Sequence, residues 1–324
     1  MKKLMTGNEA IAQGAWEAGV SYAAAYPGTP STEILETIAK YKADIVAEWA
    51  PNEKVALEAA IGASMFGARS LAAMKMVGVN VAADPLFSFA YSGVNGGMVL
   101  VSADDPGCHS SQNEQDNRHY AKFAKIAMVE PSDSQEAKDM VKAAMEISEK
   151  FDTPVLMRIT TRVCHSKSIV ETGERQEVAK RPYVRDVTKY DLVPVNARKR
   201  RVAVEERLQK LAAFTETTPL NRIEWNDKKI GIVASGISYQ YAKEVFGNEA
   251  SYLKLGFTYP LPIQKLKAFA AEVGVVYVVE EVEPYIEEQM KAAGIACIGK
   301  EKVPAIGELT PDILAKTLRG AVIP

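Results

Sequence analysis

Three polar segments of this sequence have residue types suited to chemistry, and each follows a short apolar run. They are 26–31 (Tyr-Pro-Gly-Thr-Pro-Ser), 48–53 (Glu-Trp-Ala-Pro-Asn-Glu) and 109–118, which begins at His109 and ends at Arg118. Short apolar runs between turn residues predict buried strands. Parallel strands place their carboxyl ends along one edge of a sheet, where such sheets bind ligands. We therefore expect the three segments to meet at one sheet edge.

Glu53 is the sharpest single candidate for a catalytic or cofactor-binding group. It begins a helix of small residues, 53–64, whose alanines and glycine permit close approach of another surface. A carboxylate at this place is well held. The alternative is that Glu53 only complements the helix dipole, which contributes about 0.3–1 kcal/mol, and taken alone that alternative is the better one.

The turn after the first apolar run carries Tyr26, Pro27, Gly28 and Thr29. Prolines on both sides of Gly-Thr fix the backbone and leave the Thr29 hydroxyl and nearby amides free for a polar ligand. The same four residues are also compatible with an ordinary turn before a helix. The case for a binding turn depends on the other polar segments at the same edge.

A further small-residue passage, 75–85, follows a predicted strand and contains Gly78 and Asn80. A ligand contact and a buried strand-to-helix turn are about equally favoured here. The connection 104–118 is denser in hydrogen-bonding side chains than ordinary loops, which indicates substrate recognition or a subunit interface. Its candidate substrate-binding residues are His109, Ser110, Gln112, Asn113 and Arg118.

Composition excludes several classes of protein. The chain has 324 residues with 39 basic and 41 acidic side chains, so its charge gives no reason to bind nucleic acid or an anionic membrane. Its three cysteines and three histidines lack the spacing of a disulfide framework or metal site. No signal core or long apolar stretch occurs, so we expect a cytoplasmic, soluble protein. The sequence also has neither glycine-rich nucleotide motif, which disfavours an unrelated α/β nucleotide-binding module.

Helix-like and strand-like segments alternate through the first half, as in a parallel sheet covered by helices. The pattern predicts helices at 8–18, 31–41, 52–67, 79–90, 115–124 and 133–150. It predicts strands at 21–26, 44–48, 70–76, 97–103, 126–129 and 154–160. We expect a first domain at 1–165, a linker at 166–227 with one helix at 203–214, and a smaller α/β domain at 228–324 with strands at 230–234, 252–255 and 275–281.

The sequence resembles the amino-terminal part of the alpha subunits of indolepyruvate:ferredoxin oxidoreductases, within the thiamine-diphosphate-dependent 2-oxoacid:ferredoxin oxidoreductases. The segments that match are 7–10, 25–31, 52–64, 78–86, 103–106, 109–118, 255–262 and 279–281. The resemblance implies a pyrimidine-binding thiamine fold for the first domain and a transketolase carboxy-terminal-like fold for the last.

The resemblance also implies roles for residues. Glu53, followed nine residues later by Gly62, would hydrogen-bond the aminopyrimidine ring of thiamine diphosphate and so help the cofactor to lose its C2 proton. Desolvation would raise the pKa of that carboxyl. Thr29 would lie near the reacting centre as a catalytic and substrate-binding residue. The cofactor-binding set would be Tyr26, Pro27, Gly28, Glu53, Gly78 and Asn80.

The implied reaction is oxidative decarboxylation of indolepyruvate or another arylpyruvate to an acyl-coenzyme A, with electrons passed to ferredoxin. Full-length relatives also have a diphosphate-binding domain and a cysteine-rich end, and this sequence has neither. We therefore expect Mg²⁺ and iron-sulfur clusters on a partner chain or missing domain, a second oxidoreductase subunit of beta or gamma type, and no activity of this chain alone.

Two alternatives stay open at this point. One is an oxidoreductase subunit for another 2-oxoacid, such as pyruvate, 2-oxoglutarate or 2-oxoisovalerate. The other is a non-catalytic assembly or regulatory scaffold that keeps the thiamine fold.

Overall fold

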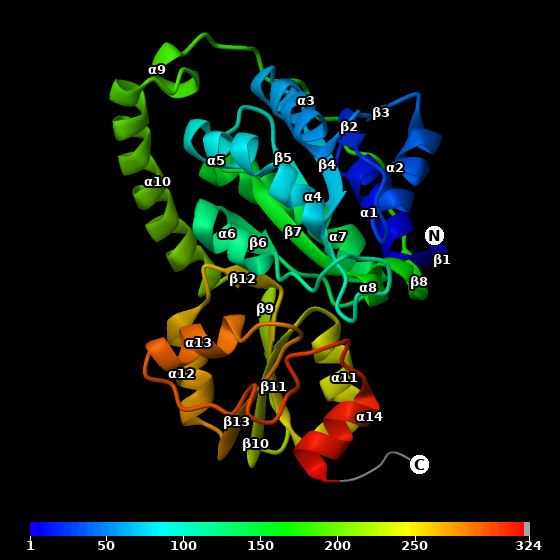
Figure 1. Cartoon of the computed structure of the whole chain (residues 1–324), viewed down its shortest axis with the longest axis vertical. Coiled ribbons are helices and arrows are strands. Elements are labelled where there is room, and N and C mark those ends of the chain that lie inside the picture. Colours follow the sequence, from blue (N-terminus) through cyan, green and yellow to red (C-terminus); the bar gives the residue numbers. More distant parts are fainter. Residues whose placement is uncertain (321–324) are drawn as a thin grey trace.

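Two stacked α/β units make up the computed structural model of the chain, in which residues 1–320 are described (Figure 1). The larger unit is built on a seven-stranded sheet and the smaller one on a four-stranded sheet. Both sheets are mainly parallel, so the predicted fold class, a parallel-sheet α/β unit followed by a smaller α/β unit, is confirmed.

The large sheet contains six parallel strands and one antiparallel strand at its edge, β12. In spatial order its strands are β12 (Phe257–Tyr259), β6 (Ala127–Val129), β7 (Val155–Thr160), β5 (Met98–Asp104), β4 (Ser70–Lys75), β2 (Tyr22–Ala25) and β3 (Val46–Trp49). Along the chain β2 comes first, β3 is then added on one side of it, and β4 and β5 are added on the other side. The direction in which strands are added therefore reverses between β3 and β4. Ligand sites of open parallel sheets form where strand order reverses in this way.

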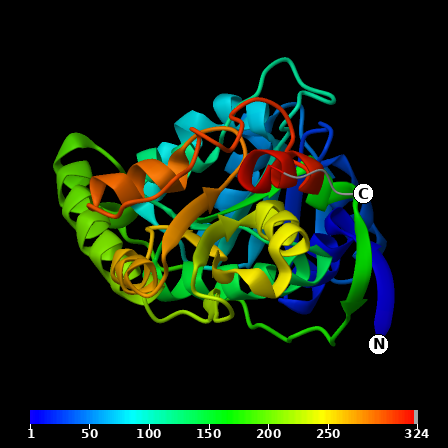
Figure 2. The same cartoon turned by 90° about the horizontal axis from the view of Figure 1, so that it is seen from below.

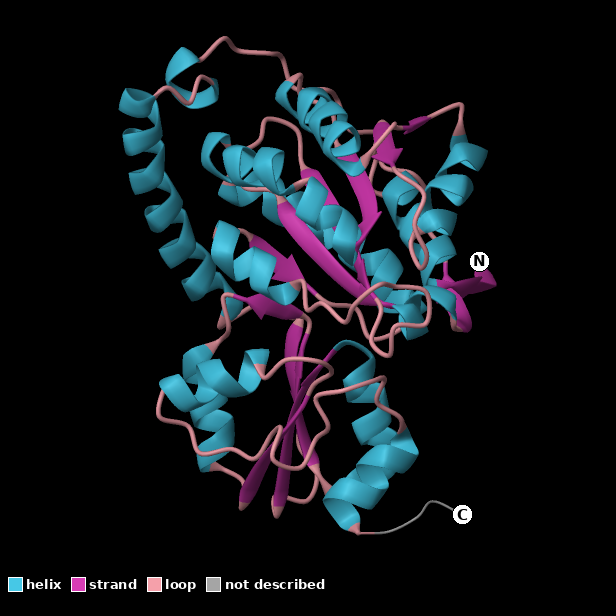
Figure 3. Ribbon diagram, viewed as in Figure 1, coloured by secondary structure: helices cyan, strands magenta, loops and turns pink. Residues whose placement is uncertain are grey.

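Helices cover both faces of the large sheet (Figure 3). Because side chains alternate along a strand, Leu71 and Ala73 of β4 pack on one face while Ala72 and Met74 pack on the other. The first face is covered by α1 (Gly7–Glu17), α2 (Thr32–Ile38), which continues as a 3₁₀ turn at Ala39–Tyr41, and α7 (Ser134–Phe151). The second is covered by α3 (Glu53–Met65), α4 (Met76–Val81), α5 (Ala83–Ser92) and α6 (Arg118–Ala124).

Side-chain caps fix where several of these helices begin. Thr6 Oγ1 accepts the amide of Glu9 at 3.1 Å and forms a capping box at the start of α1. Asp133 caps α7 by accepting the amide of Glu136 at 2.8 Å.

The small unit has the strand order β13 (Val275–Val279), β10 (Ile230–Ser235), β11 (Ser251–Leu255) and β9 (Asn221–Glu224), with β9 antiparallel. Helices cover both sides of this sheet (Figures 1 and 2). On one side lie α12 (Ile263–Ala271) and α13 (Tyr285–Ala292), and on the other α11 (Gly236–Phe246), followed by a 3₁₀ turn at Gly247–Glu249, and α14 (Pro311–Leu314), continued by a π-helical turn at Ala315–Arg319.

Residues 166–227, expected as a linker, contain four elements. These are β8 (Lys167–Glu171), which pairs with β1 (Lys2–Thr6), α9 (Val187–Tyr190), α10 (Pro194–Thr215) and β9 of the small sheet. The short helix α8 (Thr161–His165) leads into β8. In Figure 1, α10 runs along one side of the large unit toward the small one. The domain boundaries at 165 and 228 stay predictions.

Several local expectations were wrong in detail. The single helix expected at 79–90 is two helices, which meet at Ala82. The helix expected at 115–124 begins only at Arg118, because Gln115 and Asn117 are used in loop hydrogen bonds. The strands β1, β8, β9 and β12 were not predicted. These four short strands lack the continuous apolar run that marks the predicted ones, since each includes charged or polar residues. No helix in the described part of the chain is long and apolar enough to cross a membrane.

The contact between the two units is strongly charged and buried. Arg118, with a fully buried side chain, donates to Asp116 from Nε at 2.9 Å and to Glu280 of the small unit from Nη1 at 2.6 Å. Its Nη2 also donates to the backbone carbonyls of Glu281 and Glu283. Burial opposes ionisation of Asp116, but the adjacent guanidinium holds its pKa well below the usual range. Arg118 therefore fastens the small unit to the large one.

We predict that Arg118→Met lowers the free energy of unfolding by about 3–5 kcal/mol, because two buried carboxylates lose their partner. Chemical denaturation monitored by circular dichroism measures this loss. Arg162→Met is the matched control, since it breaks a half-exposed pair with Glu308 that contributes at most about 1 kcal/mol. Equal losses in the two variants would contradict the fastening role.

A second prediction concerns Glu281, where burial raises the pKa to about 7. A carboxyl whose pKa is raised in the folded state contributes stability at low pH, and this contribution is lost as pH rises through the folded pKa. Glu281→Gln should therefore gain roughly 1 to 3 kcal/mol relative to the parent between about pH 4.5 and pH 8. Denaturation curves at a series of pH values test this. Glu283→Gln, at an exposed position, should show no such relative gain.

Candidate functional site

The polar segments predicted from the sequence do meet at one sheet edge. They follow β2, β3 and β5, which are parallel, and α4 follows β4 between them. Lys75 contacts two of these segments, the turn after β2 and the loop after β5. A Cβ on Gly28 would lie 3.3 Å from the Lys75 Cβ, and Lys75 Nζ donates to the Ser110 carbonyl at 2.6 Å. The convergence predicted from the strand pattern is thus confirmed.

Glu53 lies at the start of α3, where Asn52 caps the helix by accepting the amide of Val55 at 3.0 Å. Its side chain packs directly on Gly78 of α4: a Cβ added there would lie 2.6 Å from both Cγ and Oε1 of Glu53. Glu53 is half-buried, and its carboxyl makes no hydrogen bond or ion pair within residues 1–320. A carboxyl held in this way can give or accept a proton at a ligand atom.

The turn that follows β2 is held by its own side chains. The Gly28 amide donates to Thr32 Oγ1 at 2.9 Å, and Ser31 Oγ donates to the Gly28 carbonyl at 2.9 Å. Tyr26, Pro27 and Thr29 are exposed. The turn therefore presents the Thr29 hydroxyl on a fixed backbone, as the two prolines predicted.

Asn80, on α4, belongs to a hydrogen-bonded network with the 104–118 loop. Its side-chain amide exchanges hydrogen bonds of 2.9 and 2.7 Å with that of Gln115, and Tyr120 donates to Asn80 Oδ1 at 2.7 Å. Asn117 continues the network, since it donates to the Met76 carbonyl and to Ser102. This network sets the position of α4, and with it Gly78, relative to the loop.

The loop is anchored at its base and exposed at its tip. Asp105 accepts hydrogen bonds from the Ser110 amide at 2.8 Å, from Ser111 Oγ at 2.6 Å and from Thr161 Oγ1 at 2.7 Å. Burial raises the pKa of Asp105, but these bonds outweigh it and lower the pKa overall. Gln112 and Asn113, at the tip, are exposed.

His109 lies apart from the tip and faces the small unit. Its Nε2 is 3.3 Å from the carboxylate of Glu308, which also pairs with Arg162. With Thr161, Arg162 and His165, His109 lines a cavity of about 320 Å³. The structure thus brings Ser110 to Lys75 and directs His109 to a neighbouring cavity.

Arg118 is the predicted substrate-binding residue that the structure places elsewhere. Each of its three nitrogens donates to the protein itself, and its guanidinium carbon lies 5.0 Å from the centre of the Tyr285 ring. This placement does not favour direct contact with a substrate. Arg118 is therefore not among the residues of the proposed substrate site.

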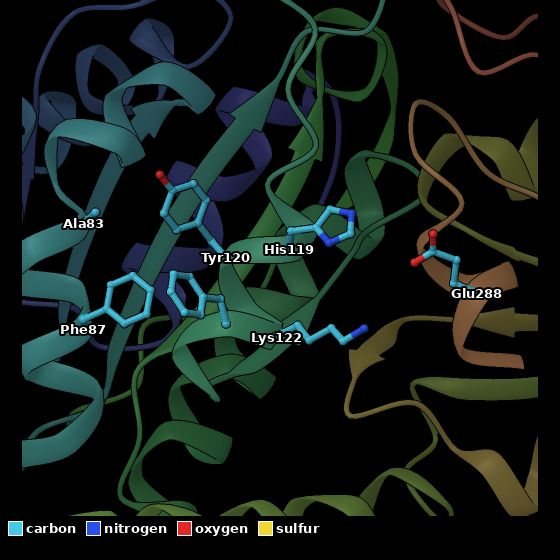
Figure 4. Close-up of a pocket in the computed structure, with 7 residues that line it drawn as sticks. Ala83, Phe87, His119, Tyr120, Lys122 and Glu288 are labelled. Atoms are coloured by element: carbon cyan, nitrogen blue, oxygen red, sulfur yellow. The ribbon is translucent and has the colours of Figure 1, made fainter. Parts of the chain in front are cut away.

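Two further cavities flank the sheet edge. One of about 430 Å³ opens beside Glu48, Trp49 and Val55, immediately before and after the start of α3. The other, of about 610 Å³, lies between α5, α6 and α13 (Figure 4). Figure 4 shows Phe87 and Tyr120 on one side of it and Glu288 across from them. The Tyr120 hydroxyl connects this second cavity to Asn80.

Sequence reasoning missed Lys75 as a site residue, although a signal existed: it is a charged residue directly after four apolar ones, 71–74. It also missed the buried ion pair of Arg158 with Asp104, at 2.8 Å. Within residues 1–320 no group of three histidine, cysteine or carboxylate side chains could hold a metal ion.

Comparison with known proteins gives one family match. Residues 13–217 match the family described as pyruvate flavodoxin/ferredoxin oxidoreductase, thiamine diphosphate-binding. Among curated proteins, the chain is 46% identical over 306 residues to the indolepyruvate oxidoreductase subunit IorA of Archaeoglobus fulgidus, covering 91% of this chain and 49% of that protein. It is 43% identical over 328 residues to the subunit of the same name from Pyrococcus horikoshii, covering 95% and 51%.

A more distant relative matches nearly end to end. The 2-oxoglutarate synthase subunit KorA of Archaeoglobus fulgidus is 25% identical over 354 residues, which covers 98% of this chain and 99% of that one. The chain spans about half the length of the indolepyruvate oxidoreductase subunits that it matches.

Two solved structures show the same fold. One is a 2-oxoglutarate:ferredoxin oxidoreductase from Magnetococcus marinus, with a TM-score of 0.79, 17% identity and coverage of 98% of this chain and 65% of that one. The other is a split-gene transketolase, with a TM-score of 0.61, 18% identity and coverage of 97% and 93%. Because the family match spans more than half of its residues, the chain belongs to the pyruvate flavodoxin/ferredoxin oxidoreductase family through its thiamine-diphosphate-binding region.

Proposed function

We propose that this chain supplies the pyrimidine-side half of a thiamine diphosphate site in a complex that oxidatively decarboxylates arylpyruvates such as indolepyruvate. In the overall reaction a 2-oxoacid and coenzyme A give an acyl-coenzyme A, carbon dioxide and a proton, and the two electrons released reduce two ferredoxins. The supporting observation is the half-buried Glu53 carboxyl, which packs on Gly78 without a protein partner.

The residues at the sheet edge fit such a cofactor. Gly28 and Gly78 have no side chain, so their backbone lies close to Lys75 and Glu53, and a ring can approach the edge. Glu53 would hold the aminopyrimidine through its ring nitrogen, and Tyr26, Pro27 and Asn80 complete the proposed cofactor contacts. When bound, thiamine diphosphate supplies a nucleophilic carbon for attack on the carbonyl of the 2-oxoacid.

The chain's own residues would hold protons and orient the substrate. The Glu53 carboxyl keeps a proton at the ring nitrogen, which requires a pocket closed to water. Thr29, on its rigid turn, is placed to donate its hydroxyl hydrogen to the substrate. Ser110, Gln112 and Asn113 offer further hydrogen bonds from the loop, and His109 offers one beside its cavity.

We propose that a partner polypeptide or a further domain binds the diphosphate tail and Mg²⁺ and carries the iron-sulfur clusters. Apolar side chains near Glu53 support this. Tyr26, Val46, Trp49 and Val55 are between 39% and 56% exposed, and within residues 1–320 no strand pairs with the outer edge of β3. Exposed apolar surface of this kind marks a site of protein association. The other proposed partners are a second oxidoreductase subunit, ferredoxin and coenzyme A. We propose that the complex acts in the cytoplasm.

The direct test is Glu53→Gln in the complex assembled with its partner chains, Mg²⁺ and thiamine diphosphate. We expect 2-oxoacid-dependent reduction of viologen to fall by about 100-fold or more, because an amide cannot exchange the proton that the ring nitrogen requires. Glu58→Gln, an exposed carboxylate farther along α3, is the control and should keep full activity. Full activity of Glu53→Gln would refute the assigned role and favour a non-catalytic scaffold.

Substrate class is tested separately with a panel of 2-oxoacids. We expect the ratio kcat/KM to be highest for indolepyruvate or phenylpyruvate, since the relatives with more than 40% identity are named for indolepyruvate. A preference for pyruvate, 2-oxoglutarate or 2-oxoisovalerate would keep the proposed cofactor site but replace the aryl assignment.

A further inference from the structure

Lys75 lies at the centre of the sheet edge, at the end of a strand with neighbours on both sides. It ends β4 and directly precedes α4, with its side chain against Gly28 on one side and Ser110 on the other. The residue is half-buried. The turn after β2 and the loop after β5 therefore both meet its side chain.

The charge of Lys75 is not balanced by a carboxylate. Its ammonium donates to the Ser110 carbonyl at 2.6 Å and forms no ion pair among the described residues. An ammonium group has three N–H donors, so two are left for another acceptor. A half-buried cation with spare donors is the arrangement that favours an anionic ligand.

The other cations near the edge are already neutralised. Lys54 pairs with Asp84 at 2.9 Å, and Arg162 pairs with Glu308 at 2.7 Å. Arg118 is enclosed by its two carboxylates. Lys75 therefore stands apart from these three as a cation that can meet a ligand's negative charge.

Lys75 is also close to the proposed chemistry. Gly78, on which Glu53 packs, lies three residues further along the chain, and the helix between them rises only about 1.5 Å per residue. Thr29 directly follows Gly28, which contacts the Lys75 stem. An anion bound at Lys75 would thus lie at the same part of the sheet edge as the proposed proton-holding carboxyl and the Thr29 turn.

We propose that Lys75 binds the carboxylate of the 2-oxoacid substrate. This inference rests on the proposed function, and it assigns substrate recognition to the last residue of β4 rather than to Arg118. The ammonium acts as a point charge that holds the carboxylate before carbon dioxide leaves. Its removal should weaken binding of the substrate more than it slows later steps.

The opposing explanation is that Lys75 only fastens the loop through the Ser110 carbonyl. The two explanations differ in charge selectivity. Loss of a carboxylate contact weakens binding of anionic ligands and spares neutral ligands of the same shape. Loss of a loop fastening weakens binding of both to a similar degree.

The experiment uses the assembled complex with Lys75→Met, Lys75→Arg and the control Lys54→Met. We measure KM and kcat for phenylpyruvate, and the Kd of 3-phenylpropionate and of 3-phenylpropan-1-ol by calorimetry. In Lys75→Met we expect KM and the Kd of 3-phenylpropionate to rise about 10- to 100-fold, as for a lost hydrogen bond to a charged group. The Kd of the alcohol should change less than about twofold. Lys75→Arg should restore part of the binding, and Lys54→Met should match the parent.

An unchanged Kd for 3-phenylpropionate in Lys75→Met, in a parent complex that oxidises 2-oxoacids, would overturn this inference and leave the proposed function standing. Equal weakening of acid and alcohol would also overturn it, in favour of the loop-fastening role. A parent complex that neither turns over 2-oxoacids nor binds 3-phenylpropionate would overturn the proposed function, and the assignment of Lys75 with it.

Discussion

Close packing of the Glu53 side chain on Gly78 is the contact on which the site depends. A methyl group at position 78 would lie 2.6 Å from the carboxyl side chain, so a larger residue there would push the Glu53 side chain out of this position. The contact joins the starts of α3 and α4, which follow adjacent regions of the same sheet edge. Asn52 fixes one helix by its cap, and the Asn80–Gln115 pair fixes the other relative to the loop. These polar interactions together fix the position of the Glu53 carboxyl group.

The sequence predicted most strands of the large sheet and the edge at which they end. Buried strands such as β5 contain continuous apolar runs, here 98–101, and their carboxyl ends had to share an edge once the strands were parallel. This placed Glu53, Thr29 and Ser110 correctly at that edge. The short strands were missed because their formation depends on a partner distant in sequence: β1 forms only against β8, about 165 residues later, and β12 only against β6.

Side-chain roles were harder to predict than positions. Arg118 stood in a segment of polar residues that looked available to a ligand, but the chain folds Asp116 and Glu280 around it. Glu280 is 162 residues away, and no local pattern records that proximity. Lys75 shows the reverse case, because its proposed role depends on its having no carboxylate partner among the described residues. Local sequence shows a charged residue, whereas only the fold shows that no carboxylate in residues 1–320 forms an ion pair with it.

The two units also share backbone structure. β12 leaves the small unit and pairs with β6, so it covers what would otherwise be an open edge of the large sheet. The buried pairs around Arg118 and Arg158 lie near the same junction. The Arg118 charge, which would be expensive to bury alone, is stable here because the large unit supplies Asp116 and the small unit supplies Glu280.

The opposite edge of the large sheet has no such cover. β3 ends the sheet, and its free backbone groups lie next to the exposed side chains of Val46 and Trp49. Uncovered strands of this kind recruit strands from other chains and promote aggregation. Recombinant production of this polypeptide by itself would then yield self-associated material, whereas simultaneous synthesis with the proposed partner chain would keep it dispersed if that chain covers β3.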